Sequence, residues 1–214
     1  MKKKINLNFD TLGWVVAAVI GIGVLSSGFA PTTESYANVD MASLIDNSNP
    51  GKAVQAQLND AKQSRLDLLQ FMYQNRVMTA DQVQQLSKLW LEDNPPAADQ
   101  ATLKSLKTQI MAASKAYEDL QAKTTLSAQD QTALATDKSE IQATSSAISQ
   151  MAQQFNQDMQ QMQQTSASGL LAKVKAAVQS AGKAQGYTVV FGKNSAPYCD
   201  HDITQTVMDA LNKG

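Results

Sequence analysis

The chain has 214 residues, of which 17% are charged and 6% aromatic, and its formal net charge at pH 7 is −1. No basic stripe is present, which excludes the usual nucleic-acid-binding surfaces, because these collect lysine and arginine on one face. A single cysteine excludes an internal disulfide framework. The few aromatic residues and the abundance of alanine, glutamine and serine favour a helical rod over a thick core.

Residues 1–30 have the pattern of an export signal. Lysines at residues 2–4 precede an apolar run over residues 12–25, and small residues follow up to Ala30. This order is typical of a cleavable signal peptide. The run is also close to the roughly 20 residues that span a bilayer, so an uncleaved inner-membrane anchor through residues 12–30 stays open. Cleavage would remove three lysines and one aspartate, which takes the formal charge from −1 to −3.

Residues 31–50 are predicted to form the N-terminal part of a small body. Apolar and polar residues alternate over residues 36–41, which indicates a half-buried strand with Val39 and Met41 facing a core. A short helical turn is expected over residues 43–48. Pro50 then suits the first turn of a new helix.

Residues 51–185 are predicted to form a helical arm. Apolar stripes indicate helices over residues 51–76 and 97–123, and residues 123–126 are the expected tip of the hairpin. Between them, Thr79 and Gln82 have the spacing of a capping box, which starts a short helix that ends before two prolines. In a hairpin, the outgoing leg of residues 51–76 and 97–123 matches the returning helix of residues 127–184 in length only if residues 77–96 project sideways and add nothing to the outgoing leg. We therefore expect the Trp90 face of that side element to pack near Phe155.

The longest predicted helix runs from Ser127 to Ala184. Apolar residues recur at seven-residue intervals, with Thr144 and Met151 between them in the same seam: Leu134, Ile141, Ile148, Phe155 and Met162. Such a repeat indicates a helix that lies along another helix. Ser127 is a candidate N-cap and Gly186 a candidate helix stop. At about 1.5 Å per residue the helix would be roughly 85 Å long, which predicts a long antiparallel hairpin.

Residues 186–214 are predicted to complete the body. Residues 187–191 read as a strand that places Val189 and Phe191 in the core, and residues 196–198 read as a short edge strand. Thr204 is expected to cap a final helix. The predicted fold is α+β, with a small β-sheet body built from both chain ends and a coiled-coil hairpin. So small a body needs neighbours from other subunits, which predicts an obligate oligomer.

Residues 199–202 form the only sequence cluster of potential metal ligands, with Cys199 and His201 in one loop. A zinc site normally needs about four ligands, so a solvated turn is the favoured interpretation. The alternatives are a metal site shared around an oligomer axis, a Cys–His nucleophile, and a thiol that links subunits. The sequence contains no glycine-rich phosphate loop and no evident catalytic constellation. We therefore predict no enzyme, no cofactor and no catalytic or metal-binding residue.

Two blocks of sequence resemble the Skp (OmpH-like) periplasmic chaperones. The first comprises residues 36–41 and 51–58, and the second runs from residues 184–190 through 202–204 to 210–213. They occur in order around a long helical insert. The resemblance implies a trimer whose β body holds three helical hairpins around a cavity. That cavity would hold unfolded outer-membrane proteins without ATP.

The expected function is therefore that of an ATP-independent holdase in the periplasm. Its partners would be unfolded outer-membrane proteins and two further copies of the chain, with no nucleic acid. The glutamine-rich segment 150–164 reads either as a solvated hairpin seam or as a soft client surface, because methionine adapts to irregular apolar partners. The candidate client-facing residues are Phe71, Met72, Met78, Met159 and Met162. The alternative function is a membrane-anchored structural spacer of the cell envelope.

Overall fold

The computed structural model describes residues 35–213, and most of them are helical. They fall into two units, one made of residues 60–160 and the other of residues 35–59 and 161–213. The predicted signal peptide or anchor, residues 1–30, lies outside the described residues. Among the helices that are described, none combines the length and the hydropathy needed to cross a bilayer.

The first strand is shorter than predicted. Strand β1 spans Tyr36–Val39, and helix α1 begins directly after it and spans Met41–Asn47. The strand ends because the Asp40 carboxylate accepts a hydrogen bond from the backbone amide of Ser43, at 2.9 Å, and so caps α1. The predicted alternation also fails at Asn38, which is only 2% exposed.

A tight corner joins α1 to helix α2, which spans Asn49–Gln74. At this corner the buried Ser48 hydroxyl accepts from the Gly51 amide at 3.2 Å. A Cβ atom at Gly51 would collide with the carbonyl oxygen of Ile45. The Asn212 side chain accepts from the Asn49 amide at 2.7 Å, which satisfies a donor that the start of a helix leaves unpaired.

Replacing Gly51 with alanine is expected to destabilise the protein. The added methyl must displace the backbone of Ile45, and overpacking of this kind typically costs about 1–3 kcal/mol. The matched control is Gly169→Ala, because no atom lies within 4 Å of the added Cβ there. Alanine at position 169 should instead stabilise the helix by up to about 1 kcal/mol. Urea unfolding midpoints measure both effects, and equal midpoints for the two variants would contradict the tight corner.

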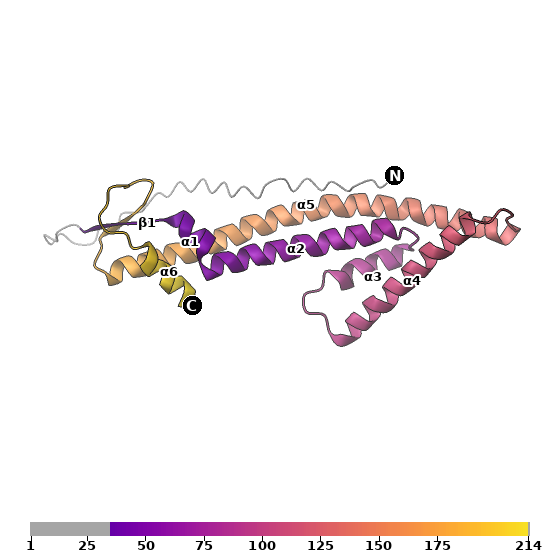
Figure 1. Ribbon diagram of the computed structural model, residues 1–214, viewed down its shortest axis with the longest axis horizontal. Helices are drawn as coiled ribbons and strands as arrows, with labels where there is room; N and C mark the ends of the chain where they lie inside the picture. The colour runs from indigo at the N-terminus through magenta and orange to yellow at the C-terminus, as the bar shows by residue number, and fades with distance from the viewer. Residues whose placement is uncertain (1–34, 214) are drawn as a thin grey trace. The chain divides into compact units, whose positions relative to one another are not determined.

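Helices α3 and α4 span Ala80–Trp90 and Ala97–Gln121. The predicted capping box is confirmed, since the Thr79 hydroxyl accepts from the Gln82 amide and the Gln82 side chain accepts from the Thr79 amide. Figure 1 shows α3 folded back beside α4 and not continuing along α2.

Helix α5 spans Ala128–Ala184, and its two ends follow the predicted signals. The Ser127 hydroxyl accepts from the Asp130 amide at 3.1 Å. The Asp130 carboxylate accepts from Lys123 at 2.8 Å and from the Ser127 amide, and these bonds lower the pKa of Asp130 to about 2. After the helix, Gly186 adopts a φ of 78°, which explains why a glycine stands there.

The seven-residue repeat of α5 marks its buried seam only in part. Leu134, Ile148 and Phe155 are buried, as is Thr144, whereas Ile141 and Met162 are half-buried. The long helix itself is confirmed. The antiparallel pairing along its whole length stays a prediction.

Strand β2 spans Val189–Gly192 and pairs with β1 in parallel, with Tyr36 opposite Val189 and Val39 opposite Gly192. The predicted edge strand at residues 196–198 is wrong. Those residues lie in a turn, in which the Cys199 amide and the Asn38 side chain both donate to the Ala196 carbonyl, and Tyr198 is 96% exposed. Helix α6, Thr204–Lys213, ends the described chain.

Each unit has its own hydrophobic core. In the unit of residues 60–160, α2, α3, α4 and α5 share one cluster of buried side chains: Leu68, Leu69, Met72, Met78, Val83, Leu86, Leu106, Ile110, Ile148 and Phe155. In the other unit the cluster joins both chain ends: Ala37, Val39, Leu44, Ile45, Leu170, Val174, Ala181, Ile203, Val207 and Leu211.

Candidate functional site

Strand β1 lies between two segments from the C-terminal end of the chain. On one side it pairs with β2. On the other side the Asn38 amide donates to the carbonyl of His201 at 2.8 Å, and Ile203 donates back to the Asn38 carbonyl at 3.0 Å. The Thr204 hydroxyl accepts from the Asp40 amide at 2.8 Å. The far edge of β2 pairs with no other strand among the residues that the structure describes.

The Asn38 side chain holds the loop that follows β2. Its Nδ2 donates to the carbonyls of Ala196 at 3.2 Å and Cys199 at 3.4 Å. Its Oδ1 is buried without a hydrogen-bond partner. One amide side chain therefore fixes two points of the loop, since both carbonyls face its donor group.

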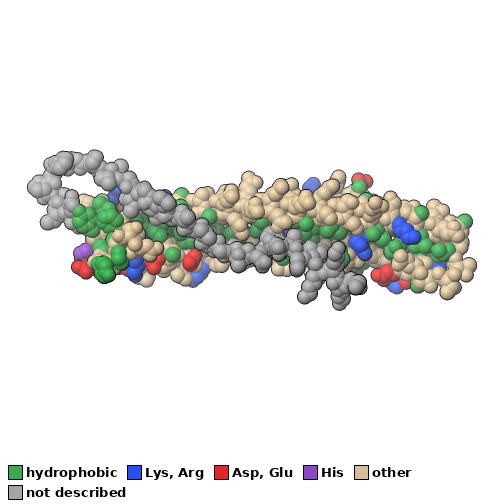
Figure 2. All heavy atoms as spheres, turned by 90° about the horizontal axis from the view of Figure 1, so that it is seen from above, with side chains coloured by type: hydrophobic (Ala, Val, Ile, Leu, Met, Phe, Trp, Pro, Cys, Tyr) green, Lys and Arg blue, Asp and Glu red, His purple; other side chains and the backbone are tan. Residues whose placement is uncertain are grey.

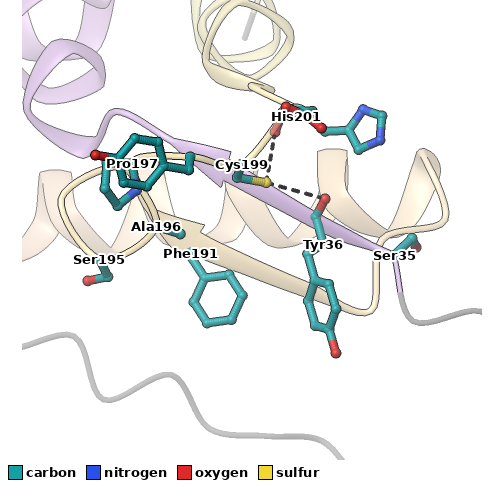
Figure 3. Close-up of a pocket in the computed structure, with 10 residues that line it drawn as sticks. Ser35, Tyr36, Phe191, Ser195, Ala196, Pro197, Cys199 and His201 are labelled. Atoms are coloured by element: carbon teal, nitrogen blue, oxygen red, sulfur yellow. Dashed lines mark hydrogen bonds between the residues drawn. The ribbon is translucent and has the colours of Figure 1, made fainter.

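A pocket of about 710 Å³ opens beside this loop (Figure 3). The rings of Tyr36 and Phe191 line it, with centroids 5.9 Å apart. Tyr36 is 40% exposed and Tyr198 almost fully so. Figure 2 shows hydrophobic side chains gathered beside the histidine at the left end of the view. Single exposed aromatic residues are common on protein surfaces, but a cluster of them usually marks an interaction site. This surface therefore has the character of an interface.

Cys199 and His201 line the same pocket but do not act on each other. The Cys199 thiol is oriented toward the carbonyls of Tyr36 and His201, at 3.6 and 3.9 Å, and Figure 3 shows the imidazole pointing away from it. The imidazole instead lies 5.7 Å from the Tyr187 ring. Within residues 35–213, no three His, Cys, Asp or Glu side chains gather closely enough to hold a metal ion.

The residues predicted to form the body core lie around this sheet. Val39 is 2% exposed and belongs to the buried cluster, and Met41 packs against that cluster. Val189 and Phe191 are half-buried. Val189 and Phe191 therefore retain some exposed apolar surface on β2, the strand with the unpaired edge.

Asp202 ties the loop to the start of α6. Hydrogen bonds from the Thr204 side chain and backbone, together with Lys193 at 3.2 Å, lower the pKa of Asp202, against the opposing effect of burial. A carboxyl whose pKa is lowered by folding stabilises the fold above its unfolded pKa of about 4. That contribution is lost as the pH falls through the folded pKa.

Asp202→Asn is therefore expected to lower stability at pH 7 but hardly at all at acidic pH. The difference in urea midpoint between the variant and the wild type should shrink steadily from pH 7 to pH 3. The control is Asp200→Asn, at an exposed carboxyl on the same loop. A difference that stays constant with pH would contradict the role given to Asp202.

The second candidate surface lies in the unit of residues 60–160. The Phe71 and Trp90 rings are 5.4 Å apart, and the Lys107 ammonium lies 5.3 Å from the first centroid and 4.3 Å from the second. A cation over two aromatic faces is held by their quadrupoles. This contact joins α2, α3 and α4 at a half-buried position.

The structure separates the five predicted client-facing residues into two groups. Phe71 and Met162 are half-buried. Met72, Met78 and Met159 are at most 3% exposed, and Met72 and Met78 belong to the buried cluster that α3 helps to form. These three cannot touch a client unless the helices separate.

A single hydrogen bond connects the start of the α3 segment to α5. The Thr144 hydroxyl, 1% exposed, donates to the carbonyl of Met78 at 3.3 Å. Thr144→Val removes that donor and leaves the buried carbonyl unpaired, which should cost about 1–2 kcal/mol. Thr136→Val is the matched control at an exposed position of the same helix, with an expected change within about 0.5 kcal/mol. Urea unfolding and amide exchange in α3 measure the effect; equal exchange in both variants would refute it.

The sequence interpretation missed what three residues bind: Asn38, Thr144 and Asn212. Of these, only Thr144 was singled out, as a member of the α5 seam. Each uses a polar side chain to bind a backbone group far away along the chain. Asn212, for example, reaches Asn49 across 163 residues. A polar residue inside an apolar pattern was the only available signal, and it applied to Thr144 alone.

A family model described as outer membrane protein (OmpH-like) matches residues 35–211. The chain belongs to the OmpH-like family. This confirms the resemblance carried by the two terminal blocks. No curated protein matches the chain. OmpH-like proteins are known as periplasmic chaperones of outer-membrane proteins and not as enzymes.

Proposed function

We propose that this protein is an ATP-independent periplasmic holdase that binds unfolded outer-membrane proteins and prevents their aggregation. The observation that carries the proposal is the family match over residues 35–211, which includes both described strands, helices α1 to α5 and most of α6. The periplasm is the compartment in which such clients pass between the two membranes. An export signal at residues 1–30 agrees with that location.

The proposed working form is a homotrimer. Three features support it: the unpaired edge of β2, the half-buried Val189 and Phe191, and the exposed aromatic rings beside the pocket. A strand edge readily accepts another strand, and a second copy would cover the apolar groups at the same time. Analytical ultracentrifugation of the purified chain tests this, and a monomer at micromolar concentration would rule it out.

The proposed arm is an antiparallel hairpin in which α5 returns along the helices that precede it. Clients would be held by many weak contacts along this arm, so that the sum is large although each contact is small. Phe71 and Met162, which are half-buried, are the accessible apolar candidates. Met72, Met78 and Met159 would join them only after the packing loosens.

The test is the aggregation of an outer-membrane β-barrel protein diluted from urea, followed by light scattering. A small molar excess of the purified chain should suppress the scattering without any nucleotide. Replacing the chain with an equal mass of an unrelated helical protein should leave the scattering high. The proposal fails if the two give the same time course.

A further inference from the structure

One face of helix α4 carries only positive charge. Between residues 100 and 117 the charged residues of this helix are three lysines, with no aspartate or glutamate. Lys104, Lys107, Thr108, Met111 and Lys115 occupy positions i, i+3, i+4, i+7 and i+11, which places them along one side of the helix. We call these five residues the lysine face. At about 1.5 Å per residue it is roughly 17 Å long.

The positive charge of the lysine face contrasts with the charge of its unit. Residues 60–160 contain nine lysines and arginines and twelve aspartates and glutamates, a formal charge of −3. Among the described residues, Lys104 and Lys107 form no ion pair, and Lys115 pairs with Asp119 of the same helix at 3.1 Å. An exposed pair of this kind contributes little energy. The face therefore offers cations whose charge the protein itself compensates only weakly.

Lys107 is held in position although its donors have no acceptor. Its ammonium lies 4.3 Å from the centroid of the Trp90 ring and 5.3 Å from that of Phe71, and these two rings hold the charge where it is. An ammonium group has three donors, and none of them makes a hydrogen bond within residues 35–213. A cation that is positioned before binding loses little freedom when a partner arrives.

The lysine face also offers apolar surface. Met111 is 49% exposed, and only Tyr36 and Tyr198 are comparably exposed large hydrophobic residues in the described part of the chain. Methionine adapts to irregular apolar partners. The Phe71 and Trp90 rings beside Lys107 are half-buried, so each keeps part of its surface open. Cations and accessible apolar groups therefore lie together on this side of α4.

A partner that fits this surface must carry carboxylates and apolar side chains close together. Strands of outer-membrane barrels alternate apolar and polar residues, so an unfolded barrel protein contains segments in which the two kinds are neighbours. We infer that the lysine face binds acidic segments of unfolded clients that also carry apolar side chains. The lysines pair with the carboxylates, and Met111 contacts the apolar groups. This inference rests on the proposed holdase function.

Two other occupants fit the lysine face less well. Proteins that bind duplex nucleic acid typically contact about 6–10 phosphates, whereas this face has three lysines in a unit of net negative charge. The core of an interface between subunits is normally depleted of lysine. In addition, the contact proposed between copies of this chain involves β2, which belongs to the other unit.

The experiment compares two charge-matched variants of the full exported chain. The face variant carries Lys104→Gln and Lys115→Gln, and the control variant carries Lys88→Gln and Lys138→Gln, at exposed positions of α3 and α5. Each variant loses two positive charges, and Lys107 is kept so that its contact with the rings is preserved. The readout is the Kd for a fluorescently labelled, urea-unfolded outer-membrane barrel protein of net negative charge, measured at 50 and 500 mM NaCl.

The face variant should bind about fivefold more weakly than the wild type at 50 mM NaCl, because two exposed ion pairs with the client are lost. At 500 mM the difference should fall below about twofold, since salt screens these pairs in the wild type. The control variant should stay within about twofold of the wild type at both concentrations. Met111→Ala should weaken binding about threefold at both, because it removes an apolar contact and no charge.

Four results would overturn the inference. Equal affinities for the face variant and the control variant would remove the face from client binding and leave the holdase proposal intact. A changed oligomer mass for the face variant in sedimentation would assign the face to contacts between copies. Loss of binding to phosphatidylglycerol vesicles in the face variant, with an unchanged client Kd, would assign it to a lipid surface. Absence of client binding by the wild type itself would overturn the proposed function together with the inference.

Discussion

Replacing Phe155 with alanine is expected to cost about 3–5 kcal/mol of unfolding free energy, the range for a large aromatic side chain removed from a core. Phe155 is 5% exposed and belongs to the cluster that four helices of its unit share. The Arg65 guanidinium lies 5.5 Å from the ring centroid, and its Nε has no hydrogen-bond partner. Loss of the ring would therefore leave both a cavity and a poorly compensated cation. Urea denaturation followed by circular dichroism measures the change.

Two further variants give this experiment its controls. Phe155→Leu fills most of the space and should cost less than about 1.5 kcal/mol. Met111→Ala removes an apolar side chain that is 49% exposed, so it should change stability by no more than about 0.5 kcal/mol. If Phe155→Ala were as mild as Met111→Ala, the helices of this unit could not be packed around Phe155.

Asn38→Asp is expected to destabilise the protein by about 3–5 kcal/mol at pH 7, because it buries an unpaired charge. The new carboxylate would face the carbonyl oxygens of Ala196 and Cys199, which now accept from the Asn38 amide. Burial and these oxygens would raise the folded pKa of the new carboxyl. The stability deficit should therefore be largest above pH 5 and shrink as the pH falls and the group takes up a proton.

The control for this substitution is Asn194→Asp, which makes the same charge change at an exposed turn of the same unit. It should alter the unfolding midpoint little at any pH between 4 and 7. Amide exchange adds a local readout, because the loop of residues 195–201 should lose protection in Asn38→Asp only. An Asn38→Asp variant as stable as the control at pH 7 would show that the asparagine does not hold this loop.

The helix caps and stops were the features of the fold that could be predicted most fully. The Thr79–Gln82 capping box, the Ser127 cap and the Gly186 stop all depend on groups within a few residues of each other, so the sequence alone contains them. The long apolar repeat fixed the existence of α5 for the same reason. The family resemblance rested on two short blocks and was confirmed by the match over residues 35–211.

The predicted edge strand at residues 196–198 failed for the opposite reason. The segment lies in a turn whose Ala196 carbonyl accepts from Asn38, a residue 158 positions away in the chain. The same long-range bonding explains why Asn38 is buried although the strand pattern assigned it to the solvent side. Burial of Met72 and Met78 likewise depended on where α3 folds, and no pattern within α2 specifies that.

The sequence by itself determined that the long helices exist, where α3 and α5 begin and which stripe of each helix is apolar, because hydrogen bonds and side-chain spacing within a few residues control these features. Only the tertiary structure decided which of those stripes are covered, how β1 is held between β2 and the segment around His201, and which polar side chains bind distant backbone groups. Those outcomes depend on contacts between residues far apart in the chain. Their geometry exists only after the helices have packed.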